Sequence, residues 1–391
     1  MIMAFLNEPS VGVPSYLLKE EHKSTKDPIG IYIHVPFCDG KCPYCDFFSL
    51  RGSEERMDQY TESVISCLKA WGSSLCRPAD TLYFGGGTPS LLGAPRLLCI
   101  TQAAREAFSL EHAEITVEVN PSGQMDRLFY GLAEGGINRL SLGLQSANEE
   151  ELRLLGRRHT VQQAYEAVRA AQRAGFHNIS LDLMIAIQGQ TPESLCRSVA
   201  FCAELEVPHL SAYLLKIEEG TLYGKQKELL HLPSEDSAAD LYLLACETIE
   251  KAGYFQYEIS NFCKPGFQSR HNLKYWNAQE YLGIGPAAHS LLNGRRFFYP
   301  RSLQGFLNGK DPQEEGLGGD LEEYTMLRLR LTDGLTEKDC QSRFGCSIPE
   351  KYRKRAARYC AAGLTQCDTT GIRLTRRGFL VSNLLLSEIL G

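Results

Sequence analysis

Short apolar runs alternate with segments of helical periodicity in the first half of the chain, and this alternation constrains the fold more than any other feature. Six runs are rich in β-branched and aromatic residues and have strand length; they lie at residues 29–35, 81–84, 115–119, 139–144, 179–187 and 210–217. Segments with helical spacing lie between them, at residues 54–71, 95–108, 161–174 and 192–205. Because parallel strands need long crossovers, usually helices, the pattern predicts an α/β fold with a parallel sheet.

Six βα units are fewer than the eight of a closed barrel, so we predict a partial (β/α)6 barrel over residues 29–220. Residues 1–28 are expected to form an N-terminal extension. Residues 221–317 have a looser pattern and form a connecting region. Residues 318–391 are predicted to form a small α+β domain that resembles a winged helix, with a short hairpin across residues 364–374. In such a barrel, the active site lies at the carboxyl ends of the strands.

Composition excludes several classes of protein. The chain has 41 Lys and Arg residues against 47 Asp and Glu residues, a formal net charge of −6, so it lacks the positive field of a general nucleic-acid binder. A basic stretch at residues 351–358 is expected to be a solvated helix face. No run of 18 apolar residues predicts a transmembrane helix, and residues 1–28 lack the features of a secretory signal. We therefore expect a cytoplasmic protein with no nucleic-acid partner.

The chain contains 14 cysteines, and three of them are closely spaced. Cys38, Cys42 and Cys45 form a CxxxCxxC motif directly after the first predicted strand. A structural zinc site needs four protein ligands, and a fourth is not obvious nearby. Three thiolates can instead hold a [4Fe–4S] cluster and leave one iron free to bind a small molecule. We favour the cluster, with zinc and inert thiols as alternatives, and expect the other cysteines to be buried free thiols.

The CxxxCxxC motif, with an aromatic residue before its third cysteine, resembles the signature of the radical S-adenosylmethionine (SAM) superfamily. The resemblance implies that the open iron binds the amino and carboxylate groups of SAM. It also implies that one electron from a donor can cleave the sulfonium bond to give a 5′-deoxyadenosyl radical. Glycines that permit close backbone approach, and polar residues at strand ends, match the SAM contacts of this superfamily. These residues are Tyr32, Tyr44, Gly86, Gly87, Thr88, Glu118, Gln145, Arg157 and Asp182.

The order of the motifs resembles the family of oxygen-independent coproporphyrinogen III oxidase, HemN, and its relative HemW, a heme chaperone. The resemblance covers roughly residues 29–390, and its densest motifs lie at residues 32–38, 85–89, 118–121, 142–145 and 181–184. The oxidase carries a fourth cysteine two positions after the third, where this chain has Phe47. The HemW branch carries an HNxxYW motif, which is present here at residues 271–276.

The HNxxYW motif has chemistry that suits heme. A neutral imidazole is a good axial ligand for heme iron, and Tyr and Trp offer flat apolar surface with a polar tip. The resemblance therefore makes His271, Tyr275 and Trp276 the candidate heme residues, with His289 as a weaker one. The alternative is a packed loop with a hydrogen-bonded histidine.

One segment departs from the family pattern. Where the family usually reads YGLPGQ after the fifth strand, this chain reads IAIQGQ at residues 185–190. Ala186 and Gln188 replace a permissive glycine and a rigid proline. The substitutions affect the side of the pocket that the resemblance assigns to a second SAM.

The resemblance implies a heme chaperone that carries a SAM-coordinated [4Fe–4S] cluster, binds heme and delivers it to an apo-protein in the membrane or the cytosol. No catalytic residue is assigned. The main alternative is an enzyme of porphyrin biosynthesis that oxidatively decarboxylates two propionates of coproporphyrinogen III. SAM cleavage, the heme recipient, the electron donor and the oligomeric state, including a homodimer, are left open.

Overall fold

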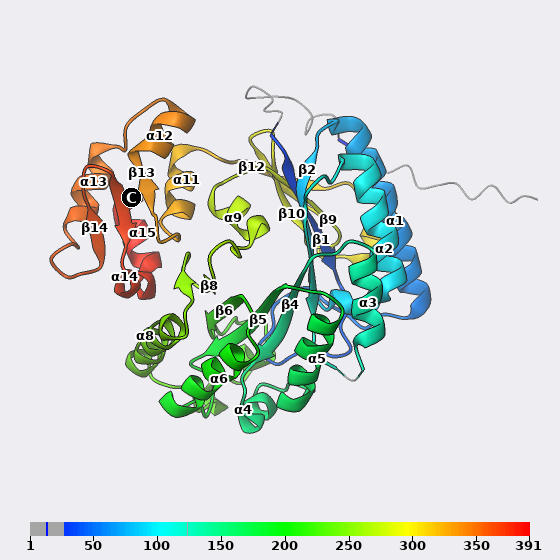
Figure 1. Cartoon of the computed structure of the whole chain (residues 1–391). Coiled ribbons are helices and arrows are strands. Elements are labelled where there is room, and N and C mark those ends of the chain that lie inside the picture. The colour runs from blue at the N-terminus through cyan, green and yellow to red at the C-terminus, as the bar shows by residue number, and fades with distance from the viewer. Residues whose placement is uncertain (1–12, 15–26, 123) are drawn as a thin grey trace, which may run out of the picture.

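The computed structural model describes residues 13–14, 27–122 and 124–391, so the predicted extension at residues 1–28 lies almost entirely outside the described part. One twelve-stranded sheet and one three-stranded sheet form its framework. Figure 1 shows the large sheet curving across the molecule with helices on its outer side, and the small sheet in a lobe at the C-terminal end. None of the described helices combines the length and the apolar content needed to cross a membrane.

Six parallel strands form the centre of the large sheet in chain order. They are β1 (Ile29–Val35), β2 (Ala79–Gly86), β3 (Glu114–Val119), β4 (Arg139–Gln145), β5 (Asn178–Ile185) and β6 (His209–Leu214). Each pairs in parallel with the next, as Ile33 of β1 does with Phe84 of β2. This arrangement confirms the predicted partial barrel. The carboxyl ends of the six strands therefore meet at one edge, where ligands bind in such folds.

Helices connect these strands and cover the outer side of the sheet. They are α1 (Glu54–Leu75), α2 (Gly93–Phe108), α3 (Asp126–Glu134), α4 (Glu149–Leu154), α5 (Val161–Arg173) and α6 (Pro192–Glu204). Side chains at the N-caps fix where several of them begin. Ser53 accepts a hydrogen bond from the amide of Arg56, and Thr160 and Thr191 each form a capping box. These bonds satisfy amides that the first helical turn leaves free.

The predicted connecting region at residues 221–317 supplies six further strands to the same sheet. On one side β9 (Tyr281–Ile284) pairs in parallel with β1, and beyond it β10 (His289–Leu292), β11 (Arg295–Phe298) and β12 (Gln313–Leu317) run antiparallel. On the other side β8 (Asn261–Cys263) and β7 (Phe255–Gln256) extend the sheet past β6. The helices of this region are α7 (Leu222–Lys225), α8 (Glu235–Lys251), α9 (Arg270–Trp276) and α10 (Leu303–Leu307).

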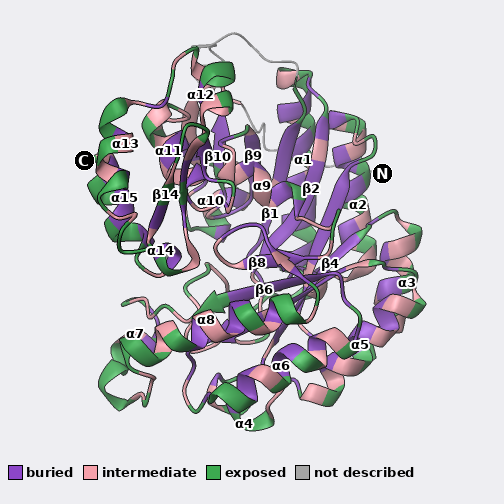
Figure 2. Ribbon diagram, turned by 60° about the vertical axis from the view of Figure 1, so that its left-hand side comes forward, coloured by how far each residue is buried: buried purple, intermediate pink, exposed green. Residues whose placement is uncertain are grey.

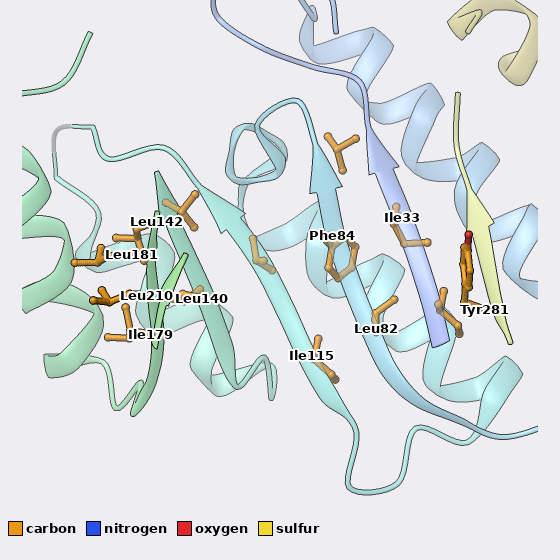
Figure 3. Close-up of a cluster of buried hydrophobic side chains, with 14 of the residues drawn as sticks. Ile33, Leu82, Phe84, Ile115, Leu140, Leu142, Ile179, Leu181, Leu210 and Tyr281 are labelled. Atoms are coloured by element: carbon orange, nitrogen blue, oxygen red, sulfur yellow. The ribbon is translucent and has the colours of Figure 1, made fainter. Parts of the chain in front are cut away.

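The hydrophobic core lies between the sheet and its outer helices. Successive strands contribute aliphatic and aromatic side chains to one continuous cluster. Figure 3 shows part of it, with Ile33 of β1, Leu82 and Phe84 of β2, and Ile115 of β3. Figure 2 shows the strands buried along their length, while the covering helices expose their outer faces. Burying each of these large side chains contributes about 1.5–3 kcal/mol, which holds the strands rigidly in register.

The C-terminal lobe contains the predicted helices and hairpin. Its helices are α11 (Leu321–Arg328), α12 (Glu337–Phe344), α13 (Glu350–Ala357), α14 (Arg376–Leu380) and α15 (Ser382–Leu390). Its antiparallel sheet is formed by β13 (Leu335–Thr336), β15 (Gly371–Leu374) and β14 (Thr365–Cys367), in that order. The basic stretch at residues 351–358 lies on α13, as expected, and Val381 separates α14 from α15. The chain thus combines a partial (β/α)6 barrel with a C-terminal lobe that packs on the same hydrophobic core.

Candidate functional site

The three cysteines of the CxxxCxxC motif lie on one loop between β1 and α1. Cys38, Cys42 and Cys45 are free thiols of intermediate exposure. The loop is closed at its base, because the amide of Cys38 donates to the carbonyl of Leu50 and the amide of Leu50 donates to the carbonyl of Pro36, at 3.0 and 2.9 Å. The thiols are therefore held at the carboxyl end of β1.

Arg157 places a positive charge beside these thiols. One of its terminal nitrogens lies 3.7 Å from the Sγ of Cys42, and the other donates to Asn120 and to the carbonyl of Gly143, both at 2.9 Å. Its Nε is buried without a hydrogen-bond partner within the described part of the chain. Burial, and the charges of Cys42 and Cys38, raise the pKa of Cys45. A cation at this position favours the thiolate form that metal ligation requires.

The donor set fits an iron–sulfur cluster better than zinc. In residues 27–122 and 124–391, no three His, Cys, Asp or Glu side chains are arranged to hold one metal ion. A structural zinc site needs four ligands on one ion. The cysteines of a [4Fe–4S] cluster bind different irons, and therefore stand farther apart. Three free thiols on one loop, with the Arg157 guanidinium beside one of them, form a donor set that could hold such a cluster.

The glycine run after β2 lets two loops approach each other. The amides of Gly87 and Thr88 donate to the carbonyls of Val35 and Phe37, at 2.8 and 2.7 Å. A Cβ atom on Gly87 would stand only 2.5 Å from the carbonyl oxygen of Phe37. The Thr88 hydroxyl lies 3.4 Å from the Sγ of Cys38 and accepts a hydrogen bond from Asn120. Residues 86–88 therefore pack against the start of the cysteine loop and hold it in place.

Two half-buried carboxyl groups lie on β3 and β5, the two strands that flank β4. Glu118 accepts hydrogen bonds from the Tyr83 hydroxyl at 2.9 Å and from the amide of Gly86 at 3.2 Å. Asp182 accepts one from the Ser141 hydroxyl at 3.2 Å. Burial raises the pKa of Glu118 to about 7 and that of Asp182 to about 6. Perturbed carboxyl groups of this kind are typical of functional sites.

The remaining predicted SAM residues lie around the same edge of the sheet. Tyr44, on the cysteine loop, lies near Arg157, and burial raises the pKa of the Tyr44 hydroxyl. Gln145 ends β4 in a left-handed conformation, with φ of +69°, and Tyr32 of β1 lies 3.1 Å from the Nδ1 of His34. A cavity of about 540 Å³ borders the cysteine loop; its lining includes Cys38, Cys42, Thr88, Asn120 and Arg157.

A second cavity, of about 850 Å³, opens on the other side of the cysteine loop, and we call it the aromatic cavity. Residues from distant parts of the chain line it. They are Tyr32, His34, Asp46, Phe47, Phe48, Leu214, Lys216, Glu218, Tyr275, Tyr281, Ala287, His289, Phe298, Tyr299, Arg301 and Glu315. Because these residues come from β1, the cysteine loop, β6 and the later strands, no local sequence motif could have predicted the cavity. The HNxxYW motif contributes one lining residue, Tyr275.

The HNxxYW motif forms α9 rather than a loop, and its three candidate residues face different surroundings. His271 is only 1% exposed; its Nδ1 lies 2.7 Å from the Thr81 hydroxyl and its Nε2 lies 2.8 Å from the Tyr275 hydroxyl. Burial, then the nearby Lys274, lowers the pKa of His271 to about 3, so the ring is neutral. Both of its nitrogens are thus occupied within the fold.

Tyr275 and Trp276 separate at the end of the same helix. The Tyr275 ring lines the aromatic cavity and packs edge-on against the Tyr281 ring, with ring centroids 4.6 Å apart. The Trp276 ring instead lies beside Arg330, 5.7 Å away, and does not line that cavity. The structure therefore brings one of the three heme candidates, Tyr275, to the aromatic cavity. The aromatic cavity is also lined by His289, Arg301 and Glu315. Of these three, the sequence predicts only His289 as a heme residue.

Comparisons with known proteins agree with this geometry. The model of the radical SAM superfamily matches residues 32–202, and that of the HemN C-terminal domain matches residues 320–381. A relative from Lactococcus lactis described as heme chaperone HemW is 36% identical over 372 residues, which cover 93% of this chain and 97% of the relative. A relative of the same description from Escherichia coli is 35% identical over 378 residues, with coverages of 93% and 98%.

A solved structure shares the fold over nearly the whole chain. It is the coproporphyrinogen III oxidase HemN from Escherichia coli, described as a radical SAM enzyme. The match has a TM-score of 0.80 at 22% sequence identity and covers 93% of this chain and 90% of that one. At this identity the match establishes the architecture, and function has to be argued from the site.

Proposed function

Since the chain belongs to the HemW family of heme chaperones within the radical SAM superfamily, we propose that it binds heme and delivers it to an apo-protein. The observation that carries this proposal is the aromatic cavity. Its volume, about 850 Å³, lies within the range of pockets that bind ligands of heme size. Its lining offers flat aromatic surface together with the side chains of Lys216 and Arg301, which suit an apolar macrocycle with carboxylate substituents.

Phe47 supports heme binding over porphyrinogen oxidation. This side chain is 64% exposed and lines the aromatic cavity next to the cysteine loop. An exposed phenyl ring at the mouth of a cavity is stabilised when an apolar ligand covers it. A cysteine at this position, as in the oxidase branch, could not provide that surface.

Superfamily membership implies a [4Fe–4S] cluster and SAM as resident cofactors. Cys38, Cys42 and Cys45 would hold the cluster, and Thr88 and Arg157 lie where they can contact its free face or SAM. When bound, the two cofactors supply a route to a carbon-centred radical. The chain's own residues would orient them: Arg157 lies beside the thiols, and Glu118 and Asp182 lie on β3 and β5 of the barrel. A cationic ligand such as SAM would offset the desolvation of these carboxyl groups.

The proposal includes an apo-protein acceptor, an electron donor and a cytoplasmic location. Free thiols at all described cysteines suit a reducing compartment, where a cluster of this type is assembled and kept reduced.

Heme binding and porphyrinogen oxidation can be separated in one experiment. The chain is reconstituted anaerobically with iron and sulfide, then divided. One portion is titrated with hemin and followed by its Soret band; the other receives coproporphyrinogen III, SAM and a reductant and is analysed for vinyl products. We expect one heme per chain and no decarboxylation. Turnover to protoporphyrinogen, or no stoichiometric heme binding, would contradict the proposal.

A further inference from the structure

We propose that His289 is the axial ligand of the heme iron in the aromatic cavity, and that Glu315 fixes the orientation of its ring. The inference rests on the proposed heme-binding function and adds to it the ligand, its supporting carboxylate and the position of the porphyrin. It differs from the expectation that His271 of the HNxxYW motif binds the iron.

His289 presents an available nitrogen to the cavity. It is the first residue of β10, and its side chain is 53% exposed and lines the cavity. Nδ1 lies 3.4 Å from an oxygen of Glu315, and in the described part of the chain Nε2 forms no hydrogen bond. If Nδ1 carries the proton toward Glu315, the lone pair is on Nε2, which is the tautomer that a metal ligand requires.

The ring of His289 is also held in orientation. It stacks on Phe298 of β11, its partner across the antiparallel pair, with ring centroids 5.3 Å apart and an interplanar angle of 24°. The Glu315 carboxylate, 3.4 Å from Nδ1, favours the ring orientation in which Nε2 faces away from it. A histidine ligand whose other nitrogen contacts a carboxylate is a recurrent arrangement in metal sites, and the carboxylate raises the basicity of the ligand.

A strand irregularity places Glu315 beside His289. Arg296 of β11 pairs with Gly316 and Phe297 pairs with Glu314, so Glu315 is an extra residue in β12. Gly316 has φ of +143°, a conformation that favours glycine. Bulges of this kind redirect a side chain and are frequent beside functional sites. Glu314, by contrast, pairs with Arg295 across the strands.

The other two histidines near the cavity have no free nitrogen. His34 lines the cavity, but it is 4% exposed; its Nδ1 lies 3.1 Å from the Tyr32 hydroxyl and its Nε2 lies 3.0 Å from the carbonyl of Phe48. His271 is occupied by Thr81 and Tyr275 in the same way. Binding iron through either residue would break a hydrogen bond and leave its partner unsatisfied inside the fold, which is unfavourable. Binding through Nε2 of His289 breaks no such bond.

The rim of the cavity supplies the remaining contacts that a heme needs. Phe47 and Leu214 are large apolar side chains that are exposed at the rim, and a porphyrin face would cover them. Arg301 lies 3.3 Å from Asp46 and Lys216 lies 2.6 Å from Glu218, and all four side chains are well exposed. Such exposed pairs are weak, so the two cations can exchange their partners for the heme propionates at little cost.

The test uses the full chain with its cluster reconstituted and hemin as the probe. Resonance Raman spectra of the ferrous heme complex are recorded for the unmodified chain and for His289→Gly. We expect an iron–histidine stretching band in the unmodified complex, its loss in the variant together with a shift of the Soret band, and its return on adding imidazole. His289→Gln, which keeps a polar side chain of similar size, should show the same loss.

Two further variants sharpen the test. Glu315→Gln should retain the band at a shifted frequency and weaken hemin binding about tenfold, since outer ligand contacts typically contribute that much. His177→Gly removes an exposed histidine just before β5 and should leave the spectrum unchanged.

The outcomes separate the inference from the function on which it rests. Stoichiometric hemin binding with an iron–histidine band that persists in His289→Gly would overturn the ligand assignment and leave heme binding intact. Binding without any iron–histidine band in the unmodified chain would do the same. Failure of the unmodified chain to bind hemin would overturn both.

Discussion

Ala186 adopts a backbone conformation that favours glycine. It follows β5 with φ of +61°, and its amide donates to the side-chain oxygen of Gln190 at 2.7 Å. The side-chain nitrogen of Gln190 donates in turn to the carbonyl of Met184 at 2.9 Å, so one glutamine holds the turn. A left-handed residue with a Cβ costs about 1–2 kcal/mol. This geometry gives a physical reason for the glycine that the family pattern has at this position.

We expect Ala186→Gly to raise the free energy of unfolding by about 1 kcal/mol. Glycine removes the strain in the folded state, and the greater conformational entropy of the unfolded chain offsets only part of that stabilisation. Urea denaturation of the two proteins measures the difference. Ala107→Gly, in the last turn of α2, is the control with normal helical backbone and should lower the free energy of unfolding, because it raises chain entropy and removes a methyl group that packs near Gly72. A loss of stability in Ala186→Gly would show that the turn is not strained.

Glu118 makes stability depend on pH. Burial raises its pKa from 4.5 in the unfolded chain to about 7 in the fold, so the folded state binds this proton more tightly. The stabilisation is therefore fully present below about pH 4.5 and is lost as the pH rises through about 7. We expect Glu118→Gln to remove this part of the pH dependence, which amounts to at most about 3 kcal/mol.

Urea denaturation of the cluster-free protein between pH 5 and about pH 8 measures the effect. The difference in stability between Glu118→Gln and the unmodified chain should grow in favour of the variant as the pH rises. Asp182 is present in both proteins, and its charge is one of the causes of the raised pKa of Glu118, so the difference between the curves includes this interaction. Parallel pH profiles would mean that Glu118 ionises normally in the fold.

The HNxxYW motif shows what local sequence can and cannot predict at this scale. The residue types were compatible with heme, and the motif identified the branch of the family. The alternative of a packed, hydrogen-bonded histidine describes His271 better, because burial of the ring depends on Thr81 and Tyr83, nearly two hundred residues earlier in the chain. His289 carried no motif at all, and its partner Glu315 depends on a strand irregularity.

At the scale of elements, the close approach of the β2 loop to the cysteine loop is the most sensitive contact. Gly87 has no room for a Cβ atom, since the carbonyl oxygen of Phe37 lies 2.5 Å from the position that it would occupy. We expect Gly87→Ala to displace the cysteine loop and to reduce the iron and sulfide retained after reconstitution at least about twofold. Chemical assay of iron and sulfide per chain measures this.

Gly220→Ala is the control for that experiment, because its nearest neighbour would be the Asp46 carboxylate at an ordinary 3.6 Å. Full cluster content is expected for the control. Equal content in Gly87→Ala would mean that the two loops can separate without consequence for the thiols.

The elements differ in how far sequence could predict them. The six parallel strands and four of their connecting helices have periodic, apolar patterns, and their bounds were predicted within a few residues; the short helices α3 and α4 were not predicted. Strands β7 to β12 are two to five residues long, and several expose charged residues such as Glu314, so no periodicity identified them. Their pairing beside β1 and β6 depends on tertiary contacts, and these contacts create most of the aromatic cavity.

At the scale of the whole molecule, the C-terminal domain is fastened to the end of α9. Arg343 donates to the carbonyls of Asn277 and Ala278, at 2.9 and 2.7 Å, and Arg328 donates to the side chain of Asn277 at 2.5 Å. These bonds satisfy carbonyls that the end of a helix leaves free. The domain thereby stabilises the helix that carries Tyr275 into the aromatic cavity.

We expect Arg343→Ala to lower the free energy of unfolding by about 1 kcal/mol, because the part-buried carbonyl of Ala278 and the exposed carbonyl of Asn277 lose their donor. Guanidinium denaturation at neutral pH measures the change. Arg377→Ala removes an exposed arginine of α14 and should have almost no effect. Equal stabilities in all three proteins would show that the domain interface does not depend on Arg343.

The cysteine loop forms a wall of two sites at once. Cys45 belongs to the proposed cluster site, and Asp46, Phe47 and Phe48, the next three residues, line the aromatic cavity. A change in the loop on binding at one site therefore alters the free energy of binding at the other. Such linkage is reciprocal, so the factor by which cluster assembly changes the affinity for the proposed heme ligand is also the factor by which that ligand changes cluster retention. The order in which the cluster and the proposed heme ligand bind would then depend on residues 45–48.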